Sequence, residues 1–228
     1  MLFGRRDLLR FCLKMSAFGL AGFLPRSLAA MVKPGMHTVS GDVRVNGAPV
    51  VPGSIVKPGD RLTTGAGGQA VLVIDFNAYL VRDDSEIIFP DEEGGLEKVL
   101  RVVSGRIMSV FGPGPMRIDM PLATIGIRGT GIYVEAYPDR NYVCLCYGKA
   151  ILKSKLEPRV REALNTTHHE GPRTFHADPK ALGAKFIEKA KMVNHKDTEL
   201  IMLEALVGRI PKFGPKPIKM PDDGYSKS

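Results

Sequence analysis

Short apolar runs separated by turn signals fill residues 37–153. In several of these runs apolar and polar residues alternate, which is the period of a strand with one buried face. Glycine-containing pairs divide the runs, at Asn46-Gly47, Pro52-Gly53, Pro58-Gly59, Gly67-Gly68 and Gly94-Gly95. Such punctuation is typical of all-β domains. The pattern therefore predicts a mainly β fold, as a sandwich, a roll or a short β-helix.

The alternation changes phase once within a single run. Ala123, Ile125 and Ile127 share one parity, whereas Ile132 and Val134 share the other. A strand keeps one face buried across such a change only if it contains an irregularity, and glycine tolerates the backbone angles of a bulge. We therefore predict a bulge at Gly129-Thr130-Gly131.

The pattern changes again after residue 153. Asp178 and Pro179 form a cap and first-turn pair for a Lys/Ala-rich helix that extends to about Val193. A second helix is expected over Thr198–Val207, with Asp197 as its cap and Gly208 at its end. Residues 154–213 are thus predicted to be a C-terminal segment with two short helices. The proline- and lysine-rich residues 214–228 are predicted to be a disordered tail.

Five separated pieces of the chain resemble the FecR domain in sequence and order. The most specific is Pro121 to Val134, with the pattern A-x-I-x-x-R-G-T-x-x-x-V. The others are Gly41-Asp-Val43, Val56 to Gly65, Ala70 to Ile74 and Val103 to Ile107. The resemblance implies a FecR-like β domain over residues 37–153 and a role as a binding or signalling module.

A looser similarity links residues 195–213 to the tail of some exported proteins with a single FecR domain. The full FecR regulator couples iron-siderophore sensing to a sigma factor. We do not expect that role here, because the chain shows no cytoplasmic anti-sigma portion before the domain. Within the motif, Arg128 is expected to form an internal salt bridge or to brace the turn, with ligand binding as the alternative.

The first 30 residues read as an export signal. Arg5-Arg6 resembles the twin-arginine consensus, and the apolar run from Met15 to Leu24 is shorter than a membrane span. Ser27-Leu28-Ala29 supplies the small residues that a signal peptidase reads. We expect a periplasmic or secreted protein, and the alternative is an uncleaved amphipathic anchor.

Removal of this segment would halve the formal net charge of the chain. The chain has a formal net charge of +8, and residues 1–30 hold half of it in five cations and one acid. The chain has no Trp and few aromatic residues for base stacking. The remaining composition does not indicate binding to nucleic acid. We expect a protein or cell-envelope partner of unknown identity. We also expect no stable transmembrane anchor.

One set of residues has the chemistry of a metal site: Cys144, Cys146, His168, His169 and His195. As i, i+2 neighbours on a strand, the two sulfurs leave the same face, opposite to a predicted core face of Val143 and Leu145. Two thiolates and two imidazoles would make a closed structural site, with zinc as the first choice. Two thiolates and one imidazole would leave an open catalytic or redox position. Adjacent histidines point apart in an extended segment, so only one of His168 and His169 is expected to join. The alternative is that both cysteines are small core residues.

Enzyme signatures are otherwise missing from the sequence. It contains no Gly-Lys-Ser/Thr phosphate loop and no Gly-x-Ser-x-Gly elbow. The sequence therefore favours an exported, non-enzymatic binding or signalling module with an unidentified ligand. The alternative is a small periplasmic metalloprotein built around the cysteines and histidines.

Overall fold

A computed structural model describes residues 33–90 and 98–214. The predicted signal peptide (residues 1–30) and all but the first residue of the predicted tail (214–228) lie outside the described residues. The described chain belongs to one compact unit. Among the described residues, no helix has the length and apolar character needed to cross a membrane.

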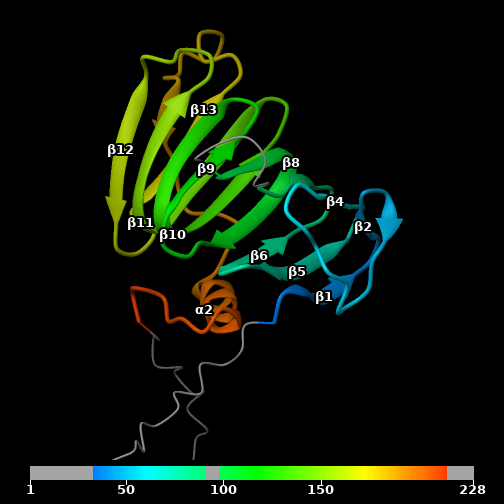
Figure 1. The fold of residues 1–228 in the computed structure, drawn as a ribbon. Helices are drawn as coiled ribbons and strands as arrows, with labels where there is room; N and C mark the ends of the chain where they lie inside the picture. Colours follow the sequence, from blue (N-terminus) through cyan, green and yellow to red (C-terminus); the bar gives the residue numbers. More distant parts are fainter. Residues whose placement is uncertain (1–32, 91–97, 215–228) are drawn as a thin grey trace, which may run out of the picture. The chain divides into compact units, whose positions relative to one another are not determined.

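Within the described ranges, fourteen strands form one sheet, and one α-helix follows them (Figure 1). The strands are β1 Gly35–Ser40, β2 Val43–Val45, β3 Ala48–Pro49, β4 Arg61–Thr64, β5 Gln69–Ile74, β6 Asn77–Val81, β7 Glu86–Ile88, β8 Lys98–Val110, β9 Pro115–Asp119, β10 Ala123–Ala136, β11 Arg140–Ser154, β12 Arg161–Thr166, β13 Gly171–His176 and β14 Ile187–Lys189. The helix, α2, spans Asp197–Leu206. The predicted mainly β fold with a C-terminal helical segment is confirmed.

The sheet follows the order β14-β13-β11-β10-β9-β8-β7-β4-β2-β3, while β1, β5, β6 and β12 branch from this path. Its pairings are antiparallel except for β8 with β9, which run parallel. Leu62 of β4, Leu72 of β5 and Leu152 of β11 all belong to one buried cluster. Strands that are distant in the order therefore share one core within a single sheet.

A second buried cluster lies on the other face of the sheet. It contains Tyr133, Cys144 and Cys146 from the strands together with Leu200 and Leu203 from α2. The helix packs against β6 and β8 (Figure 1). The central strands are therefore covered on both faces, and the C-terminal segment forms one of the covers.

The predicted bulge in β10 is confirmed. Ile127 and Ile132 both face the first cluster, and the pairing of β10 with β11 shifts register between Arg128 and Ile132. Gly129 has φ of +60°, in the left-handed region. At Gly131 a Cβ would lie 2.4 Å from the ring of Tyr147, so no side chain fits there.

The predicted helix from Pro179 to about Val193 is wrong. The Asp178 carboxylate does accept a hydrogen bond from the backbone N–H of Ala181 at 3.0 Å, as a cap would. The turn stops at Gly183, whose φ is +62°, and residues 187–189 pair with β13 instead. A glycine in the left-handed region and an available strand edge therefore outweigh the helical propensity of the Lys/Ala-rich sequence.

The sheet also continues beyond residue 153, since β12, β13 and β14 all follow the predicted end of the β domain. The second helix is confirmed as α2, and Gly208 follows it with φ of +69°. Lys196, rather than Asp197, occupies the N-cap position. Asp197 is engaged elsewhere.

Candidate metal centre

Cys144 and Cys146 lie side by side on the face of β11 that meets the C-terminal segment. Both residues have 0% exposure, and both are free thiols. Their neighbours Val143 and Leu145 point into the opposite cluster, as the alternation predicted. The strand therefore presents two sulfurs to the segment that carries the histidines.

His169 reaches the cysteines from the turn between β12 and β13. Its backbone N–H donates a hydrogen bond of 2.8 Å to the carbonyl oxygen of Cys146, which holds the turn over the strand. Its φ of +53° is in the left-handed region, and its side chain is 7% exposed. This conformation directs the ring inward.

His195 arrives from the loop that precedes α2. Its ring stacks on Tyr133 with centroids 4.6 Å apart and an interplanar angle of 24°. Its Nδ1 lies 2.6 Å from the carbonyl oxygen of Val193, so Nδ1 carries the proton and donates. The Nε2 atom is then left as a lone-pair donor that faces the cluster.

Four side chains converge where these elements meet. The sulfurs of Cys144 and Cys146 and one ring nitrogen each of His169 and His195 all lie within 4.8 Å of one another. Cys144 Sγ is 3.6 Å from His169 Nδ1, and His169 Nδ1 is 3.1 Å from His195 Nε2. Segments whose ligands are 23 to 51 residues apart in sequence thus place two sulfurs and two imidazole nitrogens around one point.

Asp197, the first residue of α2, holds the orientation of His169. Its Oδ1 lies 2.9 Å from Nε2 of His169, which therefore donates from Nε2 and keeps Nδ1 toward Cys144. The same oxygen lies 2.8 Å from Nε2 of His168. A carboxylate behind an imidazole is a common way to fix the tautomer of a metal ligand.

His168 is not part of the four-residue cluster. It forms a second group with His169 and Asp197 instead. The expectation that only one of the two adjacent histidines would face the sulfurs holds. The rings nevertheless lie near each other, with centroids 4.8 Å apart, because His169 is not extended.

The groups of the cluster shift one another's pKa values. A hydrogen bond from Cys146 and contacts with His169 and His195 lower the pKa of Cys144 to about 4, against the opposing effect of burial. Burial and the neighbouring Cys144 thiolate raise the pKa of Cys146. Burial disfavours the charged form of His169, but Cys144 and Asp197 raise its pKa overall. Without a metal, these contacts favour the thiolate form of Cys144.

The Cys144–His169–Asp197 series also has the order of a nucleophile, a base and an orienting carboxylate. A nucleophile must reach a substrate, however, and Cys144 is completely buried. The thiol of Cys146 and the imidazole of His195 also lie beside Cys144 Sγ and His169 Nδ1, and a nucleophile–base pair requires neither of them. The arrangement fits a metal better than covalent catalysis.

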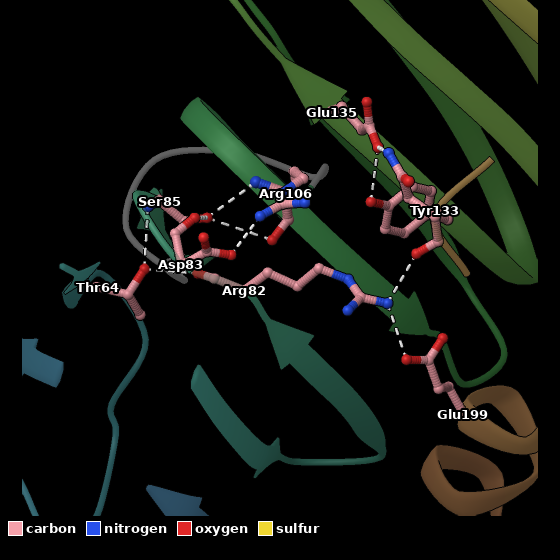
Figure 2. Close-up of polar contacts among 9 residues, drawn as sticks. Thr64, Arg82, Asp83, Ser85, Arg106, Tyr133, Glu135 and Glu199 are labelled. Carbon is pink, nitrogen blue, oxygen red and sulfur yellow. Dashed lines mark hydrogen bonds and ion pairs between the residues drawn. The ribbon is translucent and has the colours of Figure 1, made fainter. Parts of the chain in front are cut away.

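A polar network beside the cluster ties the C-terminal segment to the sheet (Figure 2). Arg82, the residue after β6, donates from Nη2 to the carbonyl oxygen of Asn194 and to Glu199 Oε1, both at 2.8 Å. Glu135 accepts hydrogen bonds from Tyr133 at 2.8 Å and from Asn194 at 2.7 Å. The loop that carries His195 is thus held from two strands.

The far end of α2 is tied as well. Tyr147 donates to Glu204, and Arg209 donates from Nη1 to the carbonyl oxygen of Phe76 at 2.6 Å. Arg209 also pairs with Glu204, whose residue exposure is 4%. Burial beside Glu204 raises the pKa of Tyr147, which stays protonated as the donor.

Arg128 does not have the role expected of it. Arg128 is exposed, and it forms no ion pair with any part of the chain that the structure describes. It lines two hollows of the surface, one beside Ile151 and one beside Arg209. The expected internal salt bridge is therefore wrong.

No family model and no curated protein matches the chain. Two crystal structures of a putative anti-sigma factor from Parabacteroides distasonis, at 2.50 Å and 1.65 Å resolution, are similar to it. Each has a TM-score of 0.49 and 13% sequence identity, and the matches cover 60% and 61% of this chain. They cover 62% and 63% of the other chains, so the similarity spans less than two thirds of their length.

Proposed function

We propose that this protein binds zinc in a closed tetrahedral site formed by Cys144, Cys146, His169 and His195. The spacing of the ligand atoms carries the proposal. A tetrahedral zinc bound at about 2.3 Å by sulfur and about 2.0–2.1 Å by nitrogen holds a sulfur and a nitrogen about 3.5 Å apart and two nitrogens about 3.3 Å apart. The corresponding distances are 3.6 Å and 3.1 Å. Soft thiolates with imidazoles favour zinc over harder cations.

The site has the character of a structural centre. Four protein ligands complete a tetrahedron and leave no position for water or substrate. Cys144 and Cys146 are fully buried, and His195 is 5% exposed. Such a site supports folding rather than turnover, because the metal binds only when all ligands are brought together.

Zinc binding would crosslink distant parts of the chain. Two ligands belong to β11, one to the turn before β13 and one to the loop before α2. Binding of the metal would stabilise the closed arrangement of these three elements and leave their separated state unaffected. The C-terminal segment would then stay fixed over the second face of the sheet.

Within this framework the protein acts as an exported, non-enzymatic binding or regulatory module with a FecR-like fold. The A-x-I-x-x-R-G-T pattern in β10 supports the family, and Arg5-Arg6 supports export by a twin-arginine route. That route carries folded proteins, so zinc could be loaded before export. Arg5→Lys with Arg6→Lys should leave precursor inside the cell, and unchanged mature protein outside would reject the route.

Elemental analysis of the purified protein tests the zinc proposal. We expect about one zinc per chain, lost in Cys144→Ser/Cys146→Ser and in His169→Asn/His195→Asn. His176→Asn is the matched control, since His176 lies outside the cluster and pairs with Glu188. This control should keep its zinc.

Replacement of zinc by cobalt provides a check on geometry. Tetrahedral Co²⁺ with thiolate ligands should give intense visible bands and a sulfur-to-metal charge-transfer band. Wild-type protein that neither contains zinc as purified nor takes it up on titration would contradict the proposal. Equal zinc content in the cysteine variant would contradict it too.

A further inference from the structure

The outer face of β9, β10, β11 and β12 carries a concentration of positive charge. The pairing of these strands places Arg128 beside Lys149, and places Lys153 beside Arg161. All four are exposed, and none forms an ion pair with the described part of the chain. Alternation along each strand puts them on the face opposite to the buried Ile125, Ile127, Ala150 and Leu152.

These cations form two rows on either side of an apolar strip. The register between the two rows runs from Arg117 through Gly126 and Ile151 to Ala163, so the strip is apolar over β10, β11 and β12. Rows on the same face lie about 7 Å apart, because two residues of a strand span that length. Ile151 is 50% exposed. The face therefore presents apolar contact in the middle and positive charge on both sides.

The strip is recessed. A groove of about 570 Å³ follows it across the four strands, from Met116 to Leu164, and Arg128 and Lys149 form part of its wall. Lys153 and Arg161 lie outside its lining. Gly126 forms part of its floor, and a Cβ added there would meet no atom within 4 Å. The groove thus has space above a residue that lacks a side chain.

Few negative charges oppose the cations at this face. Among the positions of β9 to β12 that share it, the carboxylate is Asp119, which pairs with Lys155 at 2.8 Å. Glu162 of β12 lies on the other face and pairs with Arg173. Among the described residues of this face the cations outnumber the carboxylates, and they would attract an anionic partner.

We infer that this groove binds an extended, acidic segment of a partner protein. Strands about 4.8 Å apart give the groove a length that about six residues of extended chain would cover. Carboxylates at alternate positions of such a segment would reach Arg128 and Lys149 in the wall of the groove. Apolar side chains between them would contact Ile151.

The recess favours a peptide over a membrane. A flat bilayer surface would meet the exposed cations but would not enter the groove beside Arg128 and Lys149. A chain segment can enter, bury the apolar strip and place its carboxylates beside Arg128 and Lys149. This surface does not include any ligand of the proposed zinc site, so the two proposals stand or fall separately.

Fluorescence anisotropy with a labelled peptide of about six residues, alternating glutamate and valine, tests the inference. We expect binding that weakens with added salt and is about tenfold weaker for the glutamine–valine peptide. Lys149→Glu/Lys153→Glu should weaken binding by about tenfold or more. Lys57→Glu/Lys180→Glu makes the same change in net charge at exposed sites outside the groove, and should leave binding unchanged.

A second pair of variants probes the recess itself. Gly126→Phe should fill the groove and abolish peptide binding, whereas Gly126→Ala should retain it. Thermal melts establish that both variants fold. Equal binding of the two peptides, or unchanged binding by Gly126→Phe or by Lys149→Glu/Lys153→Glu, would overturn the inference. Sedimentation with phosphatidylglycerol vesicles that depends on Lys149 and Lys153, without peptide binding, would assign the face to a membrane and also overturn it.

Discussion

At the scale of single residues, Asp197 links both adjacent histidines to the start of α2. One of its oxygens serves both His168 and His169, and only the His169 contact turns a ring nitrogen toward the sulfurs. Glu199, two residues later, lies on the same segment but pairs with Arg82. The two carboxylates therefore provide a matched comparison between orientation of a ligand and simple attachment of the helix.

Asp197→Ala should weaken zinc binding by about 10–100-fold, because loss of a carboxylate behind a ligating imidazole frees its tautomer and orientation. Competition with a chelator of known affinity measures this change. Glu199→Ala should alter zinc affinity much less. Equal effects of the two substitutions would show that Asp197 acts through the stability of the segment alone.

Gly129 tests the bulge at the same scale. Its backbone is in the left-handed region, where a β-branched side chain is strained. Gly129→Val should therefore lower the free energy of unfolding by about 1–3 kcal/mol. Gly126→Val, in the same strand but with open space at its Cβ, is the control and should be close to neutral. Denaturant melts compare the two. Equal stability of the variants would place the irregularity elsewhere.

At the scale of elements, the C-terminal segment is attached at separate points along its length. The His195 loop meets Tyr133 and Arg82, and the end of α2 meets Tyr147. The side chains of Arg82 and Glu199 are 21% and 22% exposed, and hydrogen bonds between partly buried groups are costly to leave unmade. The cysteine–histidine cluster lies among these attachments, so a metal there would lock the whole segment.

Removal of zinc by a chelator should therefore loosen a defined part of the chain. We expect amide hydrogen exchange to rise by about tenfold or more in residues 194–207 and at the His169 amide, because zinc stabilises only the closed state. The paired strands β5 and β6 should change little, since they bear no ligand. Uniform acceleration across the sheet would show instead that the metal controls global folding.

At the scale of the whole molecule, much of the fold follows from local sequence. The change of parity in β10 and the opposite faces of Val143 and Cys144 could be predicted, because strand alternation is strict. Strand β14 could not be predicted, since its pairing with β13 depends on a distant edge that local propensity does not contain.

The same division holds for the candidate site. The two cysteines and the three histidines were visible as residue types with metal chemistry, but their convergence depends on the backbone turn at His169 and on how the segment folds back. Asp197 was missed as a site residue because an aspartate before Thr-Glu-Leu reads as a helix cap. Arg128 was misjudged because a strand pattern does not show which outer face stays uncovered.

X-ray absorption at the zinc edge of the purified protein tests the proposed function through the metal's own surroundings. We expect about two sulfur ligands near 2.3 Å and about two nitrogen ligands near 2.0–2.1 Å, with the outer-shell scattering of imidazole. Cys144→Ser/Cys146→Ser should lose the zinc signal. A zinc shell made only of oxygen and nitrogen, or protein without bound zinc, would contradict the proposed zinc site.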